Sequence, residues 1–167
     1  MHPRTRAFAL GFAGLVACGA TKLPRSLSHP LLGEVAELPG ESATTRELPS
    51  DPRVTVVDFW ASWCAGCRTT LPVLEALHRD RGGDGVRVIG VALDEDPRDA
   101  EALEHALGTT FPMLDDPDQR LAGTWSVRKI PLTFVLDRRG AVRWVGRDME
   151  AMTRAVDALL AADEEAR

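Results

Sequence analysis

Two hydrophobic patterns alternate along the chain, and together they predict a mixed α/β domain. Residues 54–60 and 86–93 are nearly continuous apolar runs rich in β-branched and aromatic side chains. Such runs are typical of strands that are buried on both faces. Between them, from Arg68 onward, leucines recur at positions 71, 74 and 77. This helical spacing predicts an amphipathic helix that connects the two strands.

The second half of the chain continues with further helices and strands. A helix is expected after Asp96, because Asp is a favoured N-cap, Pro97 suits the first helical turn and Gly108 ends the apolar pattern. Residues 132–136 are apolar throughout and residues 141–145 alternate, which predicts a pair of strands before a last helix. This order of elements predicts a central mixed sheet flanked by helices on both faces.

Composition and charge restrict the class of protein. The chain has 167 residues, of which 44% are hydrophobic and 27% charged, as expected for one globular domain with a short appendage. Its formal net charge is −5, and it contains no basic run. An acidic chain of this kind argues against a nucleic acid partner.

The N-terminus carries an export signal. Arg4 and Arg6 precede an apolar run over residues 7–17, which is too short for a permanent membrane span and is typical of a signal peptide. The run ends in Leu15-Val16-Ala17-Cys18, which resembles the lipobox of bacterial lipoproteins. This resemblance implies cleavage before Cys18 and acylation of that residue. The alternative is an ordinary secretory signal with a stray cysteine, and both alternatives place the domain outside the cytoplasm.

The expected organisation therefore has three parts. Residues 1–17 form the signal peptide, residues 18–30 a lipid-anchored tether, and residues 31–167 the folded domain. The tether is expected because residues 19–30 mix small, polar and proline residues without periodicity.

The strongest chemical signal is the pair Cys64 and Cys67, which lies at the junction between the first strand and the first helix. Cys64 is expected at or just before the helix start, where free backbone N–H groups and the helix dipole lower the pKa of a thiol. Cys67, one turn later, is placed to attack a mixed disulfide that Cys64 has formed. Because a disulfide that closes so short a loop adds little stability, a chemical role is favoured.

A metal site is the alternative use of two such cysteines. Structural zinc normally needs a second pair of ligands at short spacing, and His29, His78 and His105 are scattered. No set of ligands for a copper relay lies near the pair. Residues 94–96 are acidic, but a solvated loop with a helix cap is favoured over a cation site. We therefore expect neither a metal nor an organic cofactor.

The segment around the cysteines resembles the active-site signature of thioredoxin-like proteins, in the form found in the TlpA/ResA branch of bacterial envelope thiol–disulfide oxidoreductases. Four matching motifs follow one another in the order of that family, over residues 30–162: Asp58-Phe59-Trp60-Ala61-Ser62-Trp63-Cys64-x-x-Cys67, Pro72, Ile130-Pro131-Leu132-Thr133-Phe134 and Asp137-Arg138-Arg139-Gly140. The resemblance implies a thioredoxin-like fold with a small N-terminal β-hairpin before the main sheet.

The same resemblance assigns roles to individual residues. It implies a cis peptide bond at Ile130–Pro131, with the Ile130 backbone pairing with an extended substrate strand, and Trp63 as part of the docking surface. It also implies that Asp58 relays protons to and from Cys67. Burial of Asp58 within an apolar strand is expected to raise its pKa. The alternatives are a strand-end aspartate satisfied by a local hydrogen bond and a trans proline turn.

The implied activity is a protein-disulfide reductase of the bacterial cell envelope, which faces the periplasm or the extracytoplasmic side. Its partners would be client proteins with disulfides or dithiols and a membrane electron donor. Two departures from the family pattern leave the direction of electron flow open: Ala65-Gly66 replaces the usual x-Pro pair, and Thr70 replaces a glutamate. The alternatives are a disulfide oxidant or isomerase and a non-catalytic adaptor. A thiol peroxidase is disfavoured, because Ala61 stands where peroxiredoxins carry Thr or Ser.

Overall fold

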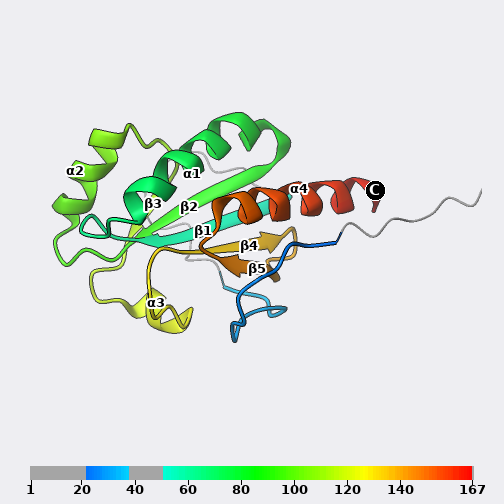
Figure 1. Cartoon of the computed structure of the whole chain (residues 1–167), viewed down its shortest axis with the longest axis horizontal. Coiled ribbons are helices and arrows are strands. Elements are labelled where there is room, and N and C mark those ends of the chain that lie inside the picture. Colours follow the sequence, from blue (N-terminus) through cyan, green and yellow to red (C-terminus); the bar gives the residue numbers. More distant parts are fainter. Residues whose placement is uncertain (1–21, 38–50, 167) are drawn as a thin grey trace, which may run out of the picture.

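The computed structural model describes residues 22–37 and 51–166 (Figure 1). Its strands are β1 (Val54–Trp60), β2 (Val86–Ala92), β3 (Met113–Asp115), β4 (Leu132–Asp137) and β5 (Val142–Gly146). Its α-helices are α1 (Cys67–Arg81), α2 (Pro97–Leu107), α3 (Arg120–Thr124) and α4 (Met149–Glu165), and a short 3₁₀ helix follows α1.

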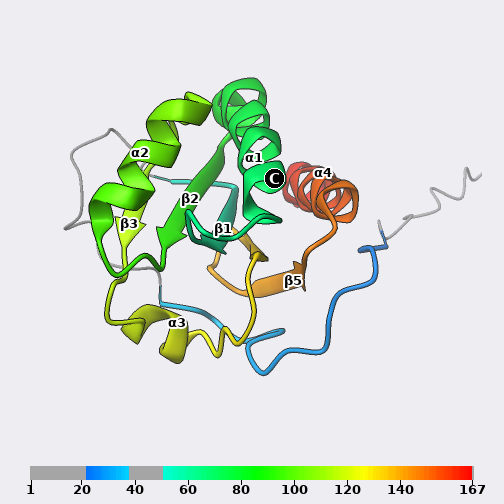
Figure 2. The ribbon, with the colours of Figure 1, turned by 60° about the vertical axis from the view of Figure 1, so that its left-hand side comes forward.

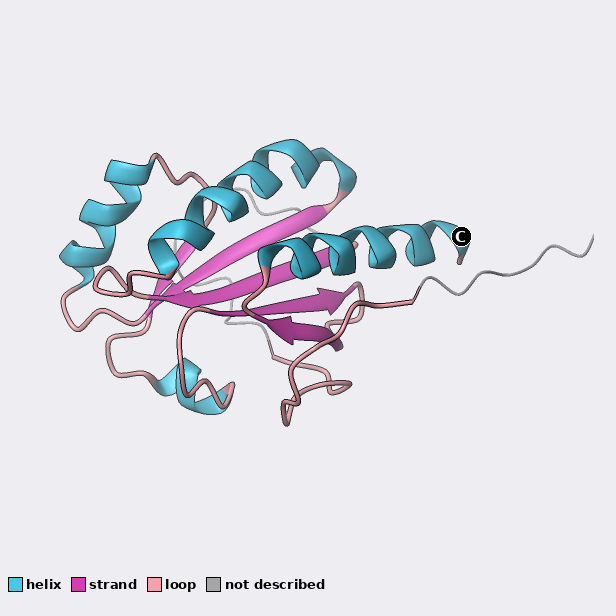
Figure 3. Ribbon diagram, viewed as in Figure 1, coloured by secondary structure: helices cyan, strands magenta, loops and turns pink. Residues whose placement is uncertain are grey.

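The strands form one mixed sheet with the order β3-β2-β1-β4-β5. β1 pairs in parallel with β2, and β2 pairs in parallel with β3, whereas β4 runs antiparallel to both β1 and β5. Helices α1 and α4 lie together on one face and α3 lies on the other, as Figures 2 and 3 show. The predicted mixed sheet with helices on both faces is confirmed.

The pattern of burial explains why these segments form strands and helices. Every residue of β1 and β2 is buried, because neighbouring strands flank both and helices cover the sheet. An aromatic group fills the α3 side of the core, where Trp125 packs edge-on against Phe134 at 4.9 Å between ring centroids and also contacts Phe59. The predicted start of α2 is confirmed as well, since the Asp96 side chain accepts a hydrogen bond from the Arg98 backbone N–H.

The N-terminal segment differs from its expected role as a tether up to residue 30. Ser26 and Leu27 both hydrogen-bond to Val145 of β5, and the Trp144 indole N–H donates to the Arg25 carbonyl at 2.9 Å. Val35 adds an isolated antiparallel bridge to Ala141. The segment docks because β5 is an edge strand whose outer backbone groups need partners.

The remaining N-terminal predictions are only partly covered by the structure. Between residues 31 and 37 it has a turn and the bridge to Ala141 in place of a hairpin strand, and the rest of the predicted hairpin lies in residues 38–50, outside the described residues. The signal peptide and Cys18 also lie outside them. Among the helices that the structure describes, none combines the length and apolar character of a membrane span.

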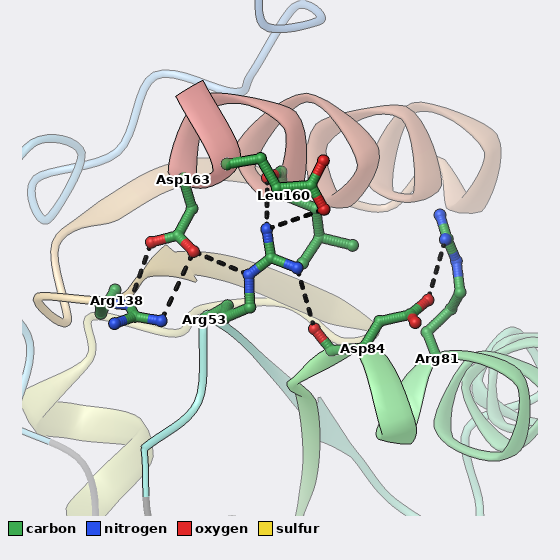
Figure 4. Close-up of polar contacts among 7 residues, drawn as sticks. Arg53, Arg81, Asp84, Arg138, Leu160 and Asp163 are labelled. Atoms are coloured by element: carbon green, nitrogen blue, oxygen red, sulfur yellow. Dashed lines mark hydrogen bonds and ion pairs between the residues drawn. The ribbon is translucent and has the colours of Figure 1, made fainter. Parts of the chain in front are cut away.

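Arg53, directly before β1, ties the C-terminal helix to the rest of the fold (Figure 4). Its guanidinium donates to the Asp163 carboxylate at 2.7 Å and to the Leu160 carbonyl at 2.7 Å, both in α4. It also contacts the carbonyl of Asp84, after α1, at 3.3 Å. Since the Arg53 side chain is mostly buried, these charge-assisted hydrogen bonds are shielded from water.

Replacing Arg53 by alanine is expected to lower the free energy of unfolding by about 2–3 kcal/mol. The substitution removes one of the two arginine partners of Asp163, which keeps its ion pair with Arg138, and leaves an α4 carbonyl without its donor in a partly buried setting. Urea denaturation monitored by tryptophan fluorescence measures this loss. Arg139→Ala is the matched control, because Arg139 is exposed and its side chain makes no ion pair with a described residue. Equal stability of the two variants would contradict the role given to Arg53.

Candidate active site

Cys64 and Cys67 form a disulfide, with 5.3 Å between their Cα atoms. Helix α1 begins at Cys67, three residues later than its expected start near Cys64. Cys64 lies in the preceding turn, and its Sγ accepts a hydrogen bond from the Cys67 backbone N–H at 3.2 Å. Cys64 thus receives a donor from the first turn of the helix although it lies outside that helix. Cys64 is 8% exposed and Cys67 is fully buried.

The turn that carries Cys64 is held at Ser62 from two sides. The Asp94 carboxylate accepts hydrogen bonds from the Ser62 backbone N–H at 3.0 Å and from its hydroxyl at 2.6 Å. From the other side, the Arg68 guanidinium donates to the Ser62 carbonyl at 3.0 Å. The end of β2 and the first turn of α1 therefore fix the position of the residues that lead into Cys64.

Sequence reasoning missed this contribution of Asp94, which it placed in a solvated loop. Asp94 is buried, because the Ser62 groups take the place of water around its carboxylate. The available signal was its position, directly after a buried strand, where functional side chains of α/β sheets gather. Within the described residues, no group of three or more His, Cys, Asp and Glu side chains is arranged to hold a metal ion.

The Ile130–Pro131 peptide bond is cis, as the family resemblance implied. The loop that contains it faces the cysteine turn, since a Cβ atom placed on Gly66 would lie 3.3 Å from Cδ of Pro131. Residues 66 and 131, far apart in the sequence, therefore form one surface together with Cys64.

Asp58 is fully buried in β1, where it lies opposite Gly90 of β2 and Thr133 of β4. The Thr133 hydroxyl donates to its Oδ1 at 2.6 Å, and its Oδ2 has no hydrogen-bond partner among the described residues. Burial raises the pKa of Asp58 to about 7, against the opposing effect of the Thr133 hydrogen bond. The predicted rise in pKa is confirmed, and the position is mid-strand and not at a strand end.

Trp63 and Thr70 differ in their exposure at the site. Trp63 is 68% exposed beside Cys64, whereas Trp60 lies in the core. Thr70, at the position where the family carries a glutamate, is buried and donates its hydroxyl to the Cys67 carbonyl at 3.1 Å. An exposed aromatic ring next to the more accessible cysteine provides an apolar contact surface.

The thioredoxin-like sheet carries a Cys-x-x-Cys disulfide beneath a cis-proline loop, together with a buried acid. These features define a thiol–disulfide oxidoreductase. Residues 34–145 match the model of the AhpC/TSA family, and the chain belongs to this family. It is 35% identical over 130 residues to the thiol:disulfide interchange protein HelX of Rhodobacter capsulatus, covering 75% of this chain and 69% of the relative. It is 27% identical over 108 residues to the thiol-disulfide oxidoreductase ResA of Bacillus anthracis, covering 65% and 61%.

A solved structure supports the same assignment. The crystal structure of a thiol:disulfide interchange protein DsbE from Chlorobium tepidum superposes with a TM-score of 0.66 at 27% sequence identity, over 81% of this chain and 99% of that one. The expected resemblance to the ResA branch, the thioredoxin-like fold and the enzyme class are therefore confirmed.

Proposed function

We propose that this protein is a disulfide reductase for client proteins, with Cys64 as the attacking residue and Cys67 as the resolving residue. The observation that carries the proposal is the difference in burial within the pair: only Cys64 reaches the surface, while Cys67 lies in the core. A client disulfide can therefore meet Cys64 alone. The Cys67 N–H that points at Cys64 Sγ stabilises a thiolate on that sulfur.

The reaction proceeds in two exchanges that together move two electrons. The Cys64 thiolate attacks one sulfur of the client disulfide, forms a mixed disulfide and releases the other client sulfur as a thiolate. Deprotonated Cys67 then attacks Cys64 Sγ, which re-forms the Cys64–Cys67 disulfide and releases the reduced client. A dithiol donor in the membrane would restore the reduced pair by the reverse exchanges.

Asp58 is proposed as the group that takes the proton from Cys67 and returns it. A carboxyl whose pKa is about 7 can exchange protons near neutral pH, and its Oδ2 has no other hydrogen-bond partner in the described part of the chain. Asp58 and Cys67 are both fully buried, so a water molecule would connect them. The Ile130 backbone and the Trp63 ring would hold the client strand beside Cys64.

The burial of Asp58 and Cys67 supports electron flow from this protein to the client. An ionised Asp58 in the core opposes a second buried negative charge on Cys67, and this repulsion disfavours the thiolate form of the reduced pair. Destabilising the reduced form lowers the reduction potential and makes the pair a better reductant. The competing role, a disulfide oxidant or isomerase, would require the stabilisation of the Cys64 thiolate by the Cys67 N–H to outweigh this repulsion.

The reduction potential of the Cys64–Cys67 pair tests the proposal. The full chain in detergent is equilibrated with glutathione or dithiothreitol buffers, and tryptophan fluorescence and thiol labelling give the oxidised fraction. A potential near that of thioredoxin, about −270 mV, is the expected result. A value near about −120 mV would make the protein an oxidant and overturn the reductase proposal. A pair that exchanges with no disulfide would leave the adaptor as the function.

We also propose a location in the bacterial cell envelope, facing the periplasm or the extracytoplasmic side, with the chain anchored through acylated Cys18. The support is the signal-peptide pattern before Cys18 and the chemistry of the site, since client disulfides persist in oxidising compartments. Mass spectrometry of the mature N-terminus should show a lipid on Cys18. Cys18→Ser should remove the lipid and release the chain from membranes, and an unmodified Cys18 would contradict the anchor.

A further inference from the structure

A groove of about 260 Å³ lies beside Trp63, the residue before Cys64, and between the end of β2, Gln119 before α3 and the loop that leads to the cis proline. Its apolar lining comes from Trp63, Leu93, Val127 and Ile130. Clefts that hold drug-sized ligands are larger, roughly 300–1,000 Å³. The volume therefore suits one or two side chains of a bound peptide, beside the turn that carries Cys64.

Basic residues line the same groove. Arg128 and Lys129 both contribute to its walls and are exposed, and neither side chain forms an ion pair with a described residue. Arg147 adds a third cation at this end, because its guanidinium donates to the Lys129 carbonyl at 3.1 Å. The unpaired side chains of Arg128 and Lys129 are unusual in a chain of net charge −5, because most other arginines of the described part bind carboxylates or carbonyls of their own fold.

The charge of the groove is one-sided. Four acidic side chains lie near one another beyond Leu93: Asp94 and Asp115 at the ends of β2 and β3, and Glu101 and Glu104 of α2. Burial, and to a smaller extent the neighbouring carboxylates, raise the pKa values of Glu104 and Asp115. The groove lining itself contains Arg128 and Lys129 and no acidic residue. An acidic client side chain is therefore attracted to the part of the groove that Arg128 and Lys129 line, which favours one orientation of a charged peptide.

We propose that this groove selects client segments that carry an apolar side chain next to the reactive cysteine and acidic side chains beyond it. The apolar side chain fills the space between Trp63 and Ile130, and the acidic side chains pair with Arg128 and Lys129. This inference rests on the proposed thiol–disulfide exchange at Cys64, and it adds the chemistry of the client that reaches that residue.

Single-turnover reduction of synthetic peptides tests the proposal. Each peptide carries one cysteine as a mixed disulfide with thionitrobenzoate. The reduced full chain in detergent attacks the peptide sulfur, thionitrobenzoate leaves as a coloured thiolate, and Cys67 then releases the peptide thiol. Three peptides are compared: one with Phe beside the cysteine and two Asp residues beyond it, one with Lys in place of both Asp residues, and one with Gly in place of Phe.

At low salt the Asp peptide should react about tenfold faster than the Lys peptide, a difference of about 1.4 kcal/mol that two exposed ion pairs can supply. The Gly peptide should also react more slowly than the Phe peptide. The preference for Asp should largely disappear at ~1 M salt, where the Debye length is about 3 Å. Arg128→Glu with Lys129→Glu should reverse the preference, whereas Arg139→Glu, which makes half that change of charge at a single distant site, should preserve it.

Exchange with a small neutral disulfide distinguishes a failure of this inference from a failure of the proposed function on which it rests. If the neutral disulfide reacts while Asp and Lys peptides react equally at low salt, the groove selects no acidic client and the inference is overturned alone. If the neutral disulfide does not react, both the inference and the proposed reductase are overturned. The salt dependence of the native chain decides the question even if the double variant fails to fold.

Discussion

Replacing Cys64 by serine abolishes disulfide exchange, with a loss of at least about 10³-fold in rate, because the buried Cys67 cannot reach a client sulfur. Cys67→Ser has a different outcome. The first exchange still occurs, but the mixed disulfide between Cys64 and the client has no internal thiol to resolve it. The Cys67 variant should therefore accumulate a covalent adduct with the client, while the Cys64 variant forms none.

Mass spectrometry under non-reducing conditions distinguishes the two variants, because only the Cys67 variant should gain the mass of one client chain. Cys18→Ser is the matched control, since it removes the remaining cysteine of the chain and should leave exchange intact. An adduct in the Cys64 variant, together with its absence in the Cys67 variant, would show that the roles of the two residues are reversed.

Asp58→Asn should stabilise the oxidised protein above neutral pH by up to about 4 kcal/mol. The pKa of Asp58 is raised to about 7 in the folded state by burial, whereas its unfolded value is about 3.9. At a pH between these two pKa values, Asp58 therefore keeps its proton in the folded state and has lost it in the unfolded state. The contribution of Asp58 to stability is present below about pH 4 and is lost as the pH rises to about 7.

Denaturant unfolding of oxidised protein between pH 4 and pH 8 checks this prediction. The native chain should lose stability relative to Asp58→Asn as the pH rises, because asparagine keeps the oxygen that accepts from Thr133 but cannot ionise. Asp80→Asn is the control, since Asp80 is exposed on α1. A constant difference between native and Asp58→Asn protein across this range would show that the carboxyl ionises at its ordinary pKa.

The same substitution separates a proton relay from a structural role. If Asp58 moves the proton of Cys67, Asp58→Asn should slow the resolving exchange by about 10²-fold and remove its dependence on pH near 7. The first exchange, made by Cys64, should change much less. Rapid-mixing kinetics with a thionitrobenzoate mixed disulfide measures both steps, and an unchanged resolving step would exclude the relay.

The parts of the fold that could be predicted are those set by local sequence. Asp96 accepts a hydrogen bond from the first turn of α2, so the cap residue together with Pro97 and Gly108 located this helix. The buried strands β1 and β2 were equally visible as continuous apolar runs. The raised pKa of Asp58 followed from one carboxyl within such a run.

The parts that could not be predicted depend on contacts between distant segments. Ser62 and Asp94 are separated by 32 positions. The strand-helix-strand order indicates that β1 and β2 end at the same edge of the sheet, but no local signal pairs the Asp94 carboxylate with Ser62. The docking of Leu27 on Val145 leaves no periodic pattern, because backbone groups make the hydrogen bond. The groove beside Trp63 likewise combines four separate segments, which only the folded sheet brings together.

The docked N-terminal segment also limits where a client strand can add to this protein. Residues 26–35 occupy the outer side of β5 through bonds to Val142 and Val145, and the opposite edge strand, β3, is only three residues long. Neither border of the sheet therefore offers a long template for pairing with an unfolded chain. Under the proposed function, an extended client that approaches with unpaired backbone groups would attach at the Ile130 loop, which faces the cysteine turn. Covering the sheet borders would then direct partly unfolded clients to the site of chemistry and protect the enzyme from aggregating with them.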